Sequence, residues 1–374
     1  MLPYGRQSVS EADIAAVTDV LRGDWLTTGP AVRQFEAELS GWAGGATCVS
    51  VTSGTAALHT AYAAARLGPG DEVVTSPMTF VATASTAAQL GATVVFADVE
   101  PDTGLLDPDA AKAAVTERTR VVSAIDYAGH PADYDALRPV ADAAGALLLD
   151  DAAHSIGGTY HGRPIGSIAD LTTFSFFPTK NLTTAEGGAV ATTRPELAER
   201  AARFRTIGLV REPDRLRFGD EGGWHQEVHE FGLNYRLPDV LCALGIAQLR
   251  RLGAFVARRA ELVDRYRRLL SDVDGLALPV QRPDVAPAWH LFSVRVLGGR
   301  RREIYDGMRA AGIGVQVNYL PVYWHPVFAD LGYRRGLCPV AEEYYSQQLS
   351  LPLFPDLTDE EQDRVVEVLR SLLG

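Results

Sequence analysis

Hydrophobic positions between residues 47 and 150 follow two alternating patterns. Short, nearly continuous apolar runs, such as 72–75 and 93–96, are typical of strands buried on both faces. Between them lie stretches with apolar residues at helical spacing, ended by glycine or proline. This alternation predicts an α/β fold, in which helices cover a mainly parallel sheet. The expected strands are 48–51, 72–75, 93–96, 120–125 and 146–149, and the expected helices are 55–67, 80–90, 110–115 and 134–144.

The two ends of the chain follow other patterns. Ser10 and Asp13 have the spacing of a capping box, and apolar residues then recur at helical spacing at Ile14, Val17, Val20 and Leu21. A second short helix is expected after Gly29-Pro30.

Beyond residue 193 the regular alternation ends. A helix is expected at 195–204, an irregular loop at 207–232, and a long helical stretch at 239–270 with a break near Gly253. The last hundred residues mix a strand at 292–296 with helices at 303–311 and 359–373. We therefore expect a large domain over residues 1–250 and a small α+β domain over residues 251–374.

Composition excludes several classes of protein. Apolar residues make up 47% and charged residues 22% of the chain, as in ordinary globular proteins, and the net charge is −12. An acidic balance argues against nucleic-acid binding, and without an apolar run of about 18 residues no membrane span is expected. Three distant cysteines without a metal-ligand spacing suggest neither a disulfide framework nor a metal site, which fits a cytoplasmic protein. The arginine clusters 250–251, 258–259 and 300–302 are expected to be solvated faces.

The most informative chemistry surrounds Lys180. This lysine ends the segment Phe174-Ser175-Phe176-Phe177-Pro178-Thr179-Lys180, and Glu186-Gly187-Gly188 follows shortly after it. Upstream, Asp151 ends an apolar strand, where a buried carboxylate requires a partner. Pyridoxal 5′-phosphate takes an amine at its aldehyde and an acid at its ring nitrogen. The pair predicts a lysine that binds this cofactor as an imine. The alternative for an acidic residue at this strand end is a helix N-cap, and Asp150 could be that cap.

Other residues are candidates for the remaining contacts. Gly54, Thr55 and Ala56 join a strand to a helix and could form an anion cradle together with Ser175, or simply a helix cap. Phe80, expected at a helix start, could stack on a pyridine ring or belong to the core. His154 could contact the cofactor's phenolic oxygen, orient Asp151, or be structural. Asn234 and Arg236 could bind phosphate or form a turn, and Tyr319 and His325 carry polar aromatic groups of a kind that can line a sugar pocket.

Together these segments resemble the DegT/DnrJ family of sugar aminotransferases, over nearly the whole chain. The resemblance rests on Thr27-Thr28-Gly29-Pro30, residues 53–58, Asp151 with His154, residues 174–176 with Lys180, Glu186-Gly187-Gly188, residues 232–236 and Leu351-Pro352. It implies the pyridoxal-phosphate-dependent fold type I, the fold of aspartate aminotransferase. Lys180, Asp151 and His154 would be catalytic, and Gly54, Thr55, Ala56, Phe80, Ser175 and Asn234 would bind the cofactor. Asn234 would reach the cofactor of the other subunit in a homodimer with shared active sites.

The resemblance extends to the branch that acts in pseudaminic-acid synthesis. It rests on Tyr4-Gly5-Arg6-Gln7, residues 126–130, residues 183–188 and residues 338–345. This branch implies L-glutamate as amino donor and C4 of a UDP-linked 2-acetamido-2,6-dideoxy-hexos-4-ulose as acceptor, with Tyr4, Thr27, Tyr319 and His325 at the sugar nucleotide. The chain departs from the branch at Thr206-Ile207 and at Phe177, where Ser-His and His are usual.

Other functions would require different residues at these positions or a different substrate. A dTDP-keto sugar or a keto-cyclitol of secondary metabolism would use the same cofactor and lysine. A non-catalytic regulatory protein of the same fold would lack the lysine, and related dehydratases carry histidine there, so Lys180 favours an aminotransferase. A nicotinamide oxidoreductase would need a glycine-rich dinucleotide turn, which is not found after the first strand.

Overall fold

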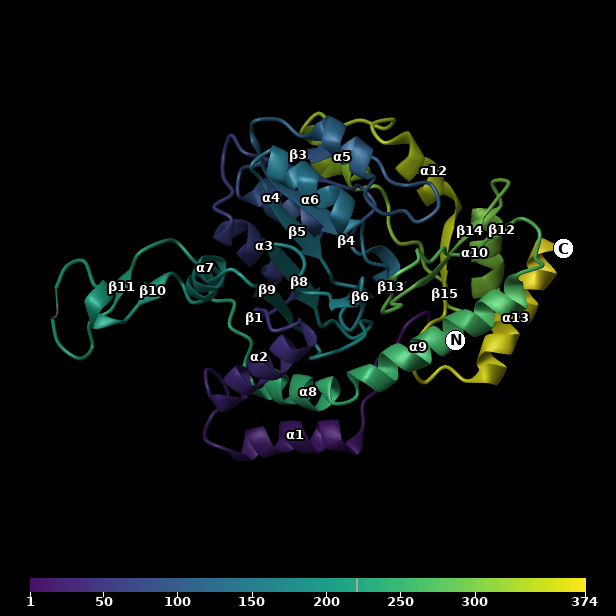
Figure 1. Cartoon of the computed structure of the whole chain (residues 1–374). Coiled ribbons are helices and arrows are strands. Elements are labelled where there is room, and N and C mark those ends of the chain that lie inside the picture. Colours follow the sequence, from purple (N-terminus) through teal and green to yellow (C-terminus); the bar gives the residue numbers. More distant parts are fainter. Residues whose placement is uncertain (220) are drawn as a thin grey trace.

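A seven-stranded sheet lies at the centre of the molecule (Figure 1). The computed structural model describes residues 1–219 and 221–374, and its strands follow the order β1-β9-β8-β5-β4-β2-β3. Strands β8, β5, β4, β2 and β3 run parallel, whereas β9 is antiparallel to both its neighbours, which confirms a mainly parallel mixed sheet. The strands are β1 (Thr47–Val51), β2 (Glu72–Thr75), β3 (Thr93–Phe96), β4 (Thr119–Ile125), β5 (Leu147–Asp151), β8 (Leu171–Ser175) and β9 (Gly188–Thr192).

Helices cover both faces of this sheet, because successive strand side chains point to opposite sides. Val73 belongs to the core on one face and Val74 to the core on the other, and Val121 and Val122 divide in the same way. The first core includes residues of α3 (Gly54–Ala64), α4 (Ala82–Gln89) and α7 (Pro195–Arg205). The second includes residues of α2 (Pro30–Trp42), α5 (Pro108–Ala114), α6 (Tyr134–Ala143) and α8 (Asp239–Leu249).

A third core lies beside the sheet, at the right of Figure 1. It is built from α9 (Leu252–Leu270), β12 (Leu276–Ala277), β14 (Phe292–Val296), α10 (Arg301–Ala310), β15 (Gln348–Leu351) and α13 (Asp359–Leu373). Helix α9 contributes Leu252 to the second core and Leu262 to the third. The domain boundary near residue 250 stays a prediction.

The N-terminal segment belongs to this third core rather than to the sheet that follows it in sequence. Leu2 is buried in the third core, its amide donates to the Gly312 carbonyl (2.9 Å), and its carbonyl accepts from the Gly314 amide (2.7 Å). The Leu353 amide donates to the Tyr4 carbonyl (2.9 Å). These bonds tie the start of the chain to segments more than 300 residues away.

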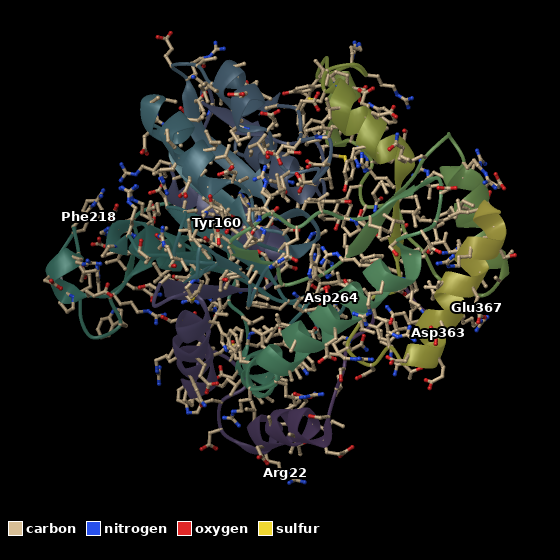
Figure 2. The ribbon with its side chains drawn as sticks, turned by 45° about the vertical axis from the view of Figure 1, so that its right-hand side comes forward. Arg22, Tyr160, Phe218, Asp264, Asp363 and Glu367 are labelled. Carbon is tan, nitrogen blue, oxygen red and sulfur yellow. The ribbon has the colours of Figure 1, made fainter. Side chains whose placement is uncertain are left out.

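An arm projects from the body next to α7 (Figure 1). It consists of residues 207–219 and 221–233, and Figure 2 shows Phe218 at its outer end. Residues expected to form an irregular loop thus contain a short antiparallel pair of strands, β10 (Leu209–Val210) and β11 (Glu227–Val228). The remaining elements are α1 (Glu11–Arg22), η1 (Tyr127–Gly129), β6 (Thr159–Tyr160), β7 (Arg163–Pro164), η2 (Pro213–Arg215), β13 (Val285–Ala286), η3 (Val322–Trp324), α11 (Pro326–Asp330) and α12 (Pro339–Gln347).

The structure confirms most expected elements and corrects three details. Phe80 lies in the turn before α4 instead of starting the helix: the N-cap is Val81, and the Phe80 carbonyl accepts from the Thr83 amide (3.3 Å). The apolar stripe of α1 does not all face the body: Ile14 and Leu21 are exposed, while the buried residue is Asp13, which pairs with Arg251 (2.9 Å).

The third correction concerns Arg259, expected on a solvated face. Only 1% of this residue is exposed, so it is among the most completely buried side chains of the described chain. Its neighbour Arg258 keeps solvent contact and pairs with Glu261 and Asp359, as expected of an arginine on the outer side of α9.

None of the described helices alone is long and apolar enough to cross a membrane. Helices α8 and α9, which are bent by 57° at the break between them, together reach the length and apolar composition of a membrane span. Nor do any three histidine, cysteine or acidic side chains in residues 1–219 and 221–374 form a group that could hold a metal ion.

Candidate active site

A cavity of about 560 Å³ lies at the carboxyl edge of the sheet, where parallel strands end together. Asp151 ends β5 and Ser175 ends β8, and both line the cavity. Residues 316–319 and Tyr4 form the opposite wall, where Tyr4 and Tyr319 pack against the first core and Val317 packs against the third. The predicted site residues brought together here are Tyr4, Gly54, Thr55, Phe80, Asp151, His154, Ser175, Lys180 and Tyr319.

Lys180 lies on the turn after β8, as expected. Its amide donates to the Phe177 carbonyl (2.9 Å), which closes the turn and directs the residue to the cavity. Burial disfavours the ammonium form and lowers the pKa of Lys180 to about 8, against the opposing effect of the Asp151 charge. At pH 7 about one tenth of the amine is therefore uncharged, far more than for an ordinary lysine, and the uncharged amine is the form that a nucleophilic lysine requires.

Asp151 is the carboxylate of the site. It is 5% exposed, and it accepts hydrogen bonds from the Thr83 hydroxyl (2.6 Å) and from the Ala153 amide (3.3 Å). Burial raises its pKa, while the Thr83 hydrogen bond and the Lys180 charge oppose the rise. In the described residues no cationic side chain lies within 4.0 Å of it, so the carboxylate can take a cationic ligand group.

Asp150, the neighbour of Asp151 on β5, is no helix cap. It is fully buried on the opposite face of the strand, and neither carboxyl oxygen has a hydrogen-bond partner in the described structure. Burial first, and then the charge of Asp126, raises its pKa well above the ordinary value. Asp126 itself accepts hydrogen bonds from Tyr134 and Ser155 (both 2.6 Å).

We predict that Asp150→Asn stabilises the protein in a pH-dependent way. The pKa of Asp150 is higher in the folded than in the unfolded chain, so wild-type stability is lost as pH rises from about 4 towards the folded pKa. Asparagine has no charge to bury, so near pH 7 the variant should exceed wild type by about 1–3 kcal/mol. Urea denaturation at pH 4 and pH 7 measures this, with exposed Asp19→Asn as control. A gain independent of pH would contradict the neutral state of Asp150.

The start of α3 forms one end of the cavity. Ser53 caps the helix by accepting from the Ala56 amide (3.1 Å), and Gly54 and Thr55 line the cavity beside Ser175. A Cβ atom at Gly54 would lie 2.8 Å from that of Ser175, so only glycine permits this contact. Exposed amides at a helix start and two hydroxyls suit an anionic group.

Aromatic side chains form the walls. Phe80 is 56% exposed, and its ring lies 6.0 Å from that of Tyr319. The Tyr319 hydroxyl is 3.1 Å from Nε2 of His154, whose ring is 4.4 Å from His290. Burial, and then the Lys180 charge, lowers the pKa of His154 well below its ordinary value, so this imidazole is neutral at physiological pH.

Four predicted residues do not line the cavity. The Ala56 amide is used by the Ser53 cap, and Thr27 and Asn234 are exposed on the protein surface. His325 lies at the start of α11, outside the lining. Roles for these four residues stay predictions. A second, smaller cavity of about 190 Å³ is lined by Arg205 and Arg236, and Arg236 lies two residues after Asn234 in the sequence.

Sequence reasoning missed several residues of the site. Thr83, Thr179, His290, Gln316 and Asn318 all line the cavity. Thr83 lies one turn after Phe80, and that helical spacing was the available signal. The others come from segments whose approach to the site depends on how the third core packs against the sheet.

The cavity fits pyridoxal phosphate. The cradle that a Cβ atom would fill at Gly54 suits the phosphate, and the Lys180 amine, whose pKa is lowered, suits the aldehyde. Asp151 has no cationic partner within 4.0 Å in the part of the chain that the structure describes, and it suits the ring nitrogen. Phe80, exposed within the cavity lining, offers a flat surface to the ring.

Comparison with known proteins adds independent findings. A model of the DegT/DnrJ/EryC1/StrS aminotransferase family matches residues 7–370. The spore coat polysaccharide biosynthesis protein SpsC of Bacillus subtilis is 39% identical, over 100% of this chain and 97% of SpsC. The PLP-form structure of Spr1654 from Streptococcus pneumoniae has a TM-score of 0.93 and 30% identity, covering 100% and 98% of the two chains. Helicobacter pylori PseC, an aminotransferase involved in pseudaminic acid biosynthesis, has a TM-score of 0.92 and 28% identity, covering 100% and 99%.

Proposed function

Since this chain belongs to the DegT/DnrJ/EryC1/StrS aminotransferase family, whose members are pyridoxal-phosphate-dependent sugar aminotransferases of fold type I, we propose the reaction that it catalyses. It transfers the amino group of L-glutamate to C4 of a nucleotide-linked 4-keto-6-deoxy sugar, of the UDP-2-acetamido-2,6-dideoxy-hexos-4-ulose type. One observation carries the proposal: a half-buried lysine with a lowered pKa, a buried carboxylate with no cationic partner among the described residues, and a helix start all line a single cavity.

The residues divide the work as follows. When bound, pyridoxal phosphate acts as an electron sink and carries the amino group between donor and acceptor. Lys180 would hold the cofactor's aldehyde carbon, and Asp151 its ring nitrogen. Gly54, Thr55 and Ser175 would bind the phosphate. Once displaced by the donor, the amine of Lys180 carries the proton released from the donor's Cα, because a pKa of about 8 lets the nitrogen both accept and release protons near neutral pH.

The side chains around this centre orient the reactants. Thr83 fixes the Asp151 carboxylate through its hydrogen bond. His154, held neutral by burial, keeps the Tyr319 hydroxyl at the cavity wall (3.1 Å). Tyr4 and Tyr319 lie on the cavity wall opposite the strand ends and would contact the sugar, while Thr27 and His325 would contact the nucleotide part from outside the described cavity.

Two relatives support a glycan-type sugar substrate. The biosynthesis of spore coat polysaccharide and of pseudaminic acid, in which SpsC and PseC are involved, both concern carbohydrates. PseC also supports the assignment to the branch that the segments at residues 4–7 and 338–345 resemble.

A substrate panel tests the proposal. The cofactor-loaded enzyme is mixed with L-glutamate and, in turn, a UDP-linked 2-acetamido 4-keto sugar, a dTDP-linked keto sugar and a keto-cyclitol, and aminated products are identified by mass spectrometry. We expect the highest kcat/KM for the UDP-linked sugar, and no product with Lys180→Met. Preference for either other acceptor would replace the substrate assignment, and no amination of any ketone would overturn the reaction.

We also propose that two copies form a homodimer with shared active sites. The arm carries Phe218, Trp224 and Phe231, which are 85%, 79% and 99% exposed, an unusual concentration of aromatic surface for a projecting segment. Asn234 follows directly after the arm and is exposed. A second copy that covers the arm would bring Asn234 to the neighbouring cavity, where an amide could bind the cofactor phosphate.

Hybrid dimers test this sharing. In the proposed dimer, each active site takes Lys180 from one subunit and Asn234 from the other. Lys180→Met and Asn234→Ala therefore each impair both sites of their own dimer, and each variant alone should have low activity. Mixing them after unfolding and refolding in equal amounts should restore about one quarter of wild-type activity, because half of the dimers are hybrids with one intact site each. Activity in the mixture no higher than the mean of the two variants would contradict shared sites. Sedimentation of each sample, which reports the dimer, is the control.

A further inference from the structure

Arg259, on α9, is an arginine buried without a carboxylate. It is 1% exposed, and within the described chain no acidic side chain lies within 4.0 Å of it. A buried guanidinium without a counterion is costly, and an apolar side chain of similar length would avoid the cost. The position therefore calls for a reason specific to the guanidinium group.

Three backbone carbonyls receive its hydrogen bonds. Nη1 donates to the carbonyls of Leu353 (2.9 Å) and His290 (3.3 Å), and Nη2 is 3.5 Å from the carbonyl of Thr179. These carbonyls belong to three segments far apart in the sequence. A planar guanidinium presents five N–H donors in a fixed fork that spans widely separated acceptors, whereas an ammonium presents its three donors from a single atom and an apolar group presents none.

Each of the three segments carries a wall of the cavity. Thr179 precedes Lys180, and the His290 ring lines the cavity against His154. Leu353 is not in the lining, but its amide donates to the Tyr4 carbonyl (2.9 Å), and Tyr4 is. The N-terminal segment also approaches the lysine turn directly, because a Cβ atom at Gly5 would lie 3.6 Å from the Thr179 side chain. On the same helix, Tyr266 donates to the Pro352 carbonyl (3.0 Å) and reinforces the hold on this segment.

We propose that Arg259 is a positioning residue, which holds the Lys180 turn, the His290 segment and the Tyr4 segment in a fixed mutual arrangement. Through them it sets the place from which the lysine amine reaches the cofactor and the sugar. This assignment of Lys180 and Tyr4 rests on the proposed function; the hold itself does not, because it is made between backbone groups of the chain. The expected consequence is that loss of the guanidinium loosens the site locally without unfolding either core.

Amide hydrogen exchange of the full-length protein, with and without cofactor, tests the hold. In Arg259→Lys and Arg259→Met the amides of Lys180 and Leu353 should exchange about tenfold or more faster, because the carbonyl-bearing segments are no longer fixed, while strand β4 stays protected. Arg268→Met is the matched control, an exposed arginine on the same helix that should change neither amide. Arg259→Lys keeps the positive charge and the aliphatic part of the side chain, so it still tests the role of the guanidinium group if Arg259→Met does not fold.

Kinetics supply the second readout. A misplaced lysine should lower kcat of Arg259→Lys by about 10–100-fold, more than it changes KM for glutamate. Unchanged exchange at Lys180 and Leu353, or exchange raised equally throughout the protein with kcat per folded molecule unchanged, would overturn the positioning role. If Lys180→Met instead kept its activity, the proposed function would fail, whereas the exchange result would stand.

Discussion

Replacement of Lys180 by methionine is expected to reduce kcat by about 10⁴-fold or more, because one change removes both the covalent attachment of the cofactor and the carrier of the proton. The methionine stem has similar length and packs in the same space. Turnover is measured as 2-oxoglutarate formed from L-glutamate with saturating pyridoxal phosphate and keto sugar, and the loaded wild type should show an absorbance band that this variant lacks. Full turnover in the variant would exclude Lys180 from the mechanism.

The cofactor-free form of the same variant gives a readout independent of turnover. Burial lowers the pKa of Lys180 to about 8, so the folded wild type bears the cost of a buried ammonium below that pH. The variant should therefore be more stable than wild type at pH 7. The difference should shrink as pH rises from about 8 towards the ordinary lysine pKa of about 10.4, where the amine is neutral in both states. Thermal unfolding at pH 7 and pH 10 measures it.

Replacement of Asp151 by asparagine is the second large effect, with an expected loss of about 10²–10³ in kcat. The amide keeps the shape of the side chain but carries no charge to support a protonated ring nitrogen. Asp150→Asn is the matched control, since it neutralises the adjacent strand position on the opposite face and should keep kcat close to wild type. Equal losses in the two variants would show that the effect comes from the strand and not from the charge that faces the cavity.

The pH profile separates charge from shape at this position. The Thr83 hydroxyl stabilises the ionised form of Asp151, so Thr83→Val should raise the pKa of Asp151 further above its ordinary value. The acidic limb of kcat/KM should then move to higher pH, because the carboxylate is protonated earlier as pH falls. An unchanged acidic limb would exclude Asp151 as the group that titrates there.

Local patterns were enough for most of the elements. Strands β2, β3 and β14 and helix α13 have the bounds expected from the sequence, since apolar runs bounded by glycine or caps depend on neighbours in the chain. The sequence pattern did not predict which face of a helix is buried where residues distant in the sequence determine that face. In α1, Asp13 is buried through its pairing with Arg251, a residue 238 positions later, so the helix turns Ile14 and Leu21 outward.

The residues of the site also divide into those that local patterns predict and those that depend on distant parts of the chain. Lys180, Asp151, Ser175 and the start of α3 were predicted because strand ends and helix starts of a parallel sheet meet at one edge. Arg259 was misassigned, because an arginine on an apparently amphipathic helix carries no local sign of three carbonyls around it. Asn234 and Thr27 stay predictions, since neither lines the cavity of the single chain.

The attachment of the N-terminal segment bears on how the enzyme is made. Leu2 and Tyr4 are synthesised more than 300 residues before their backbone partners at residues 312–314 and 353. The central sheet has all of its strands by residue 192 and can fold during synthesis, as domains generally do. The part of the cavity wall that Tyr4 forms cannot be completed until residue 353 has emerged, so a polypeptide terminated before that residue would have the sheet but an incomplete cavity.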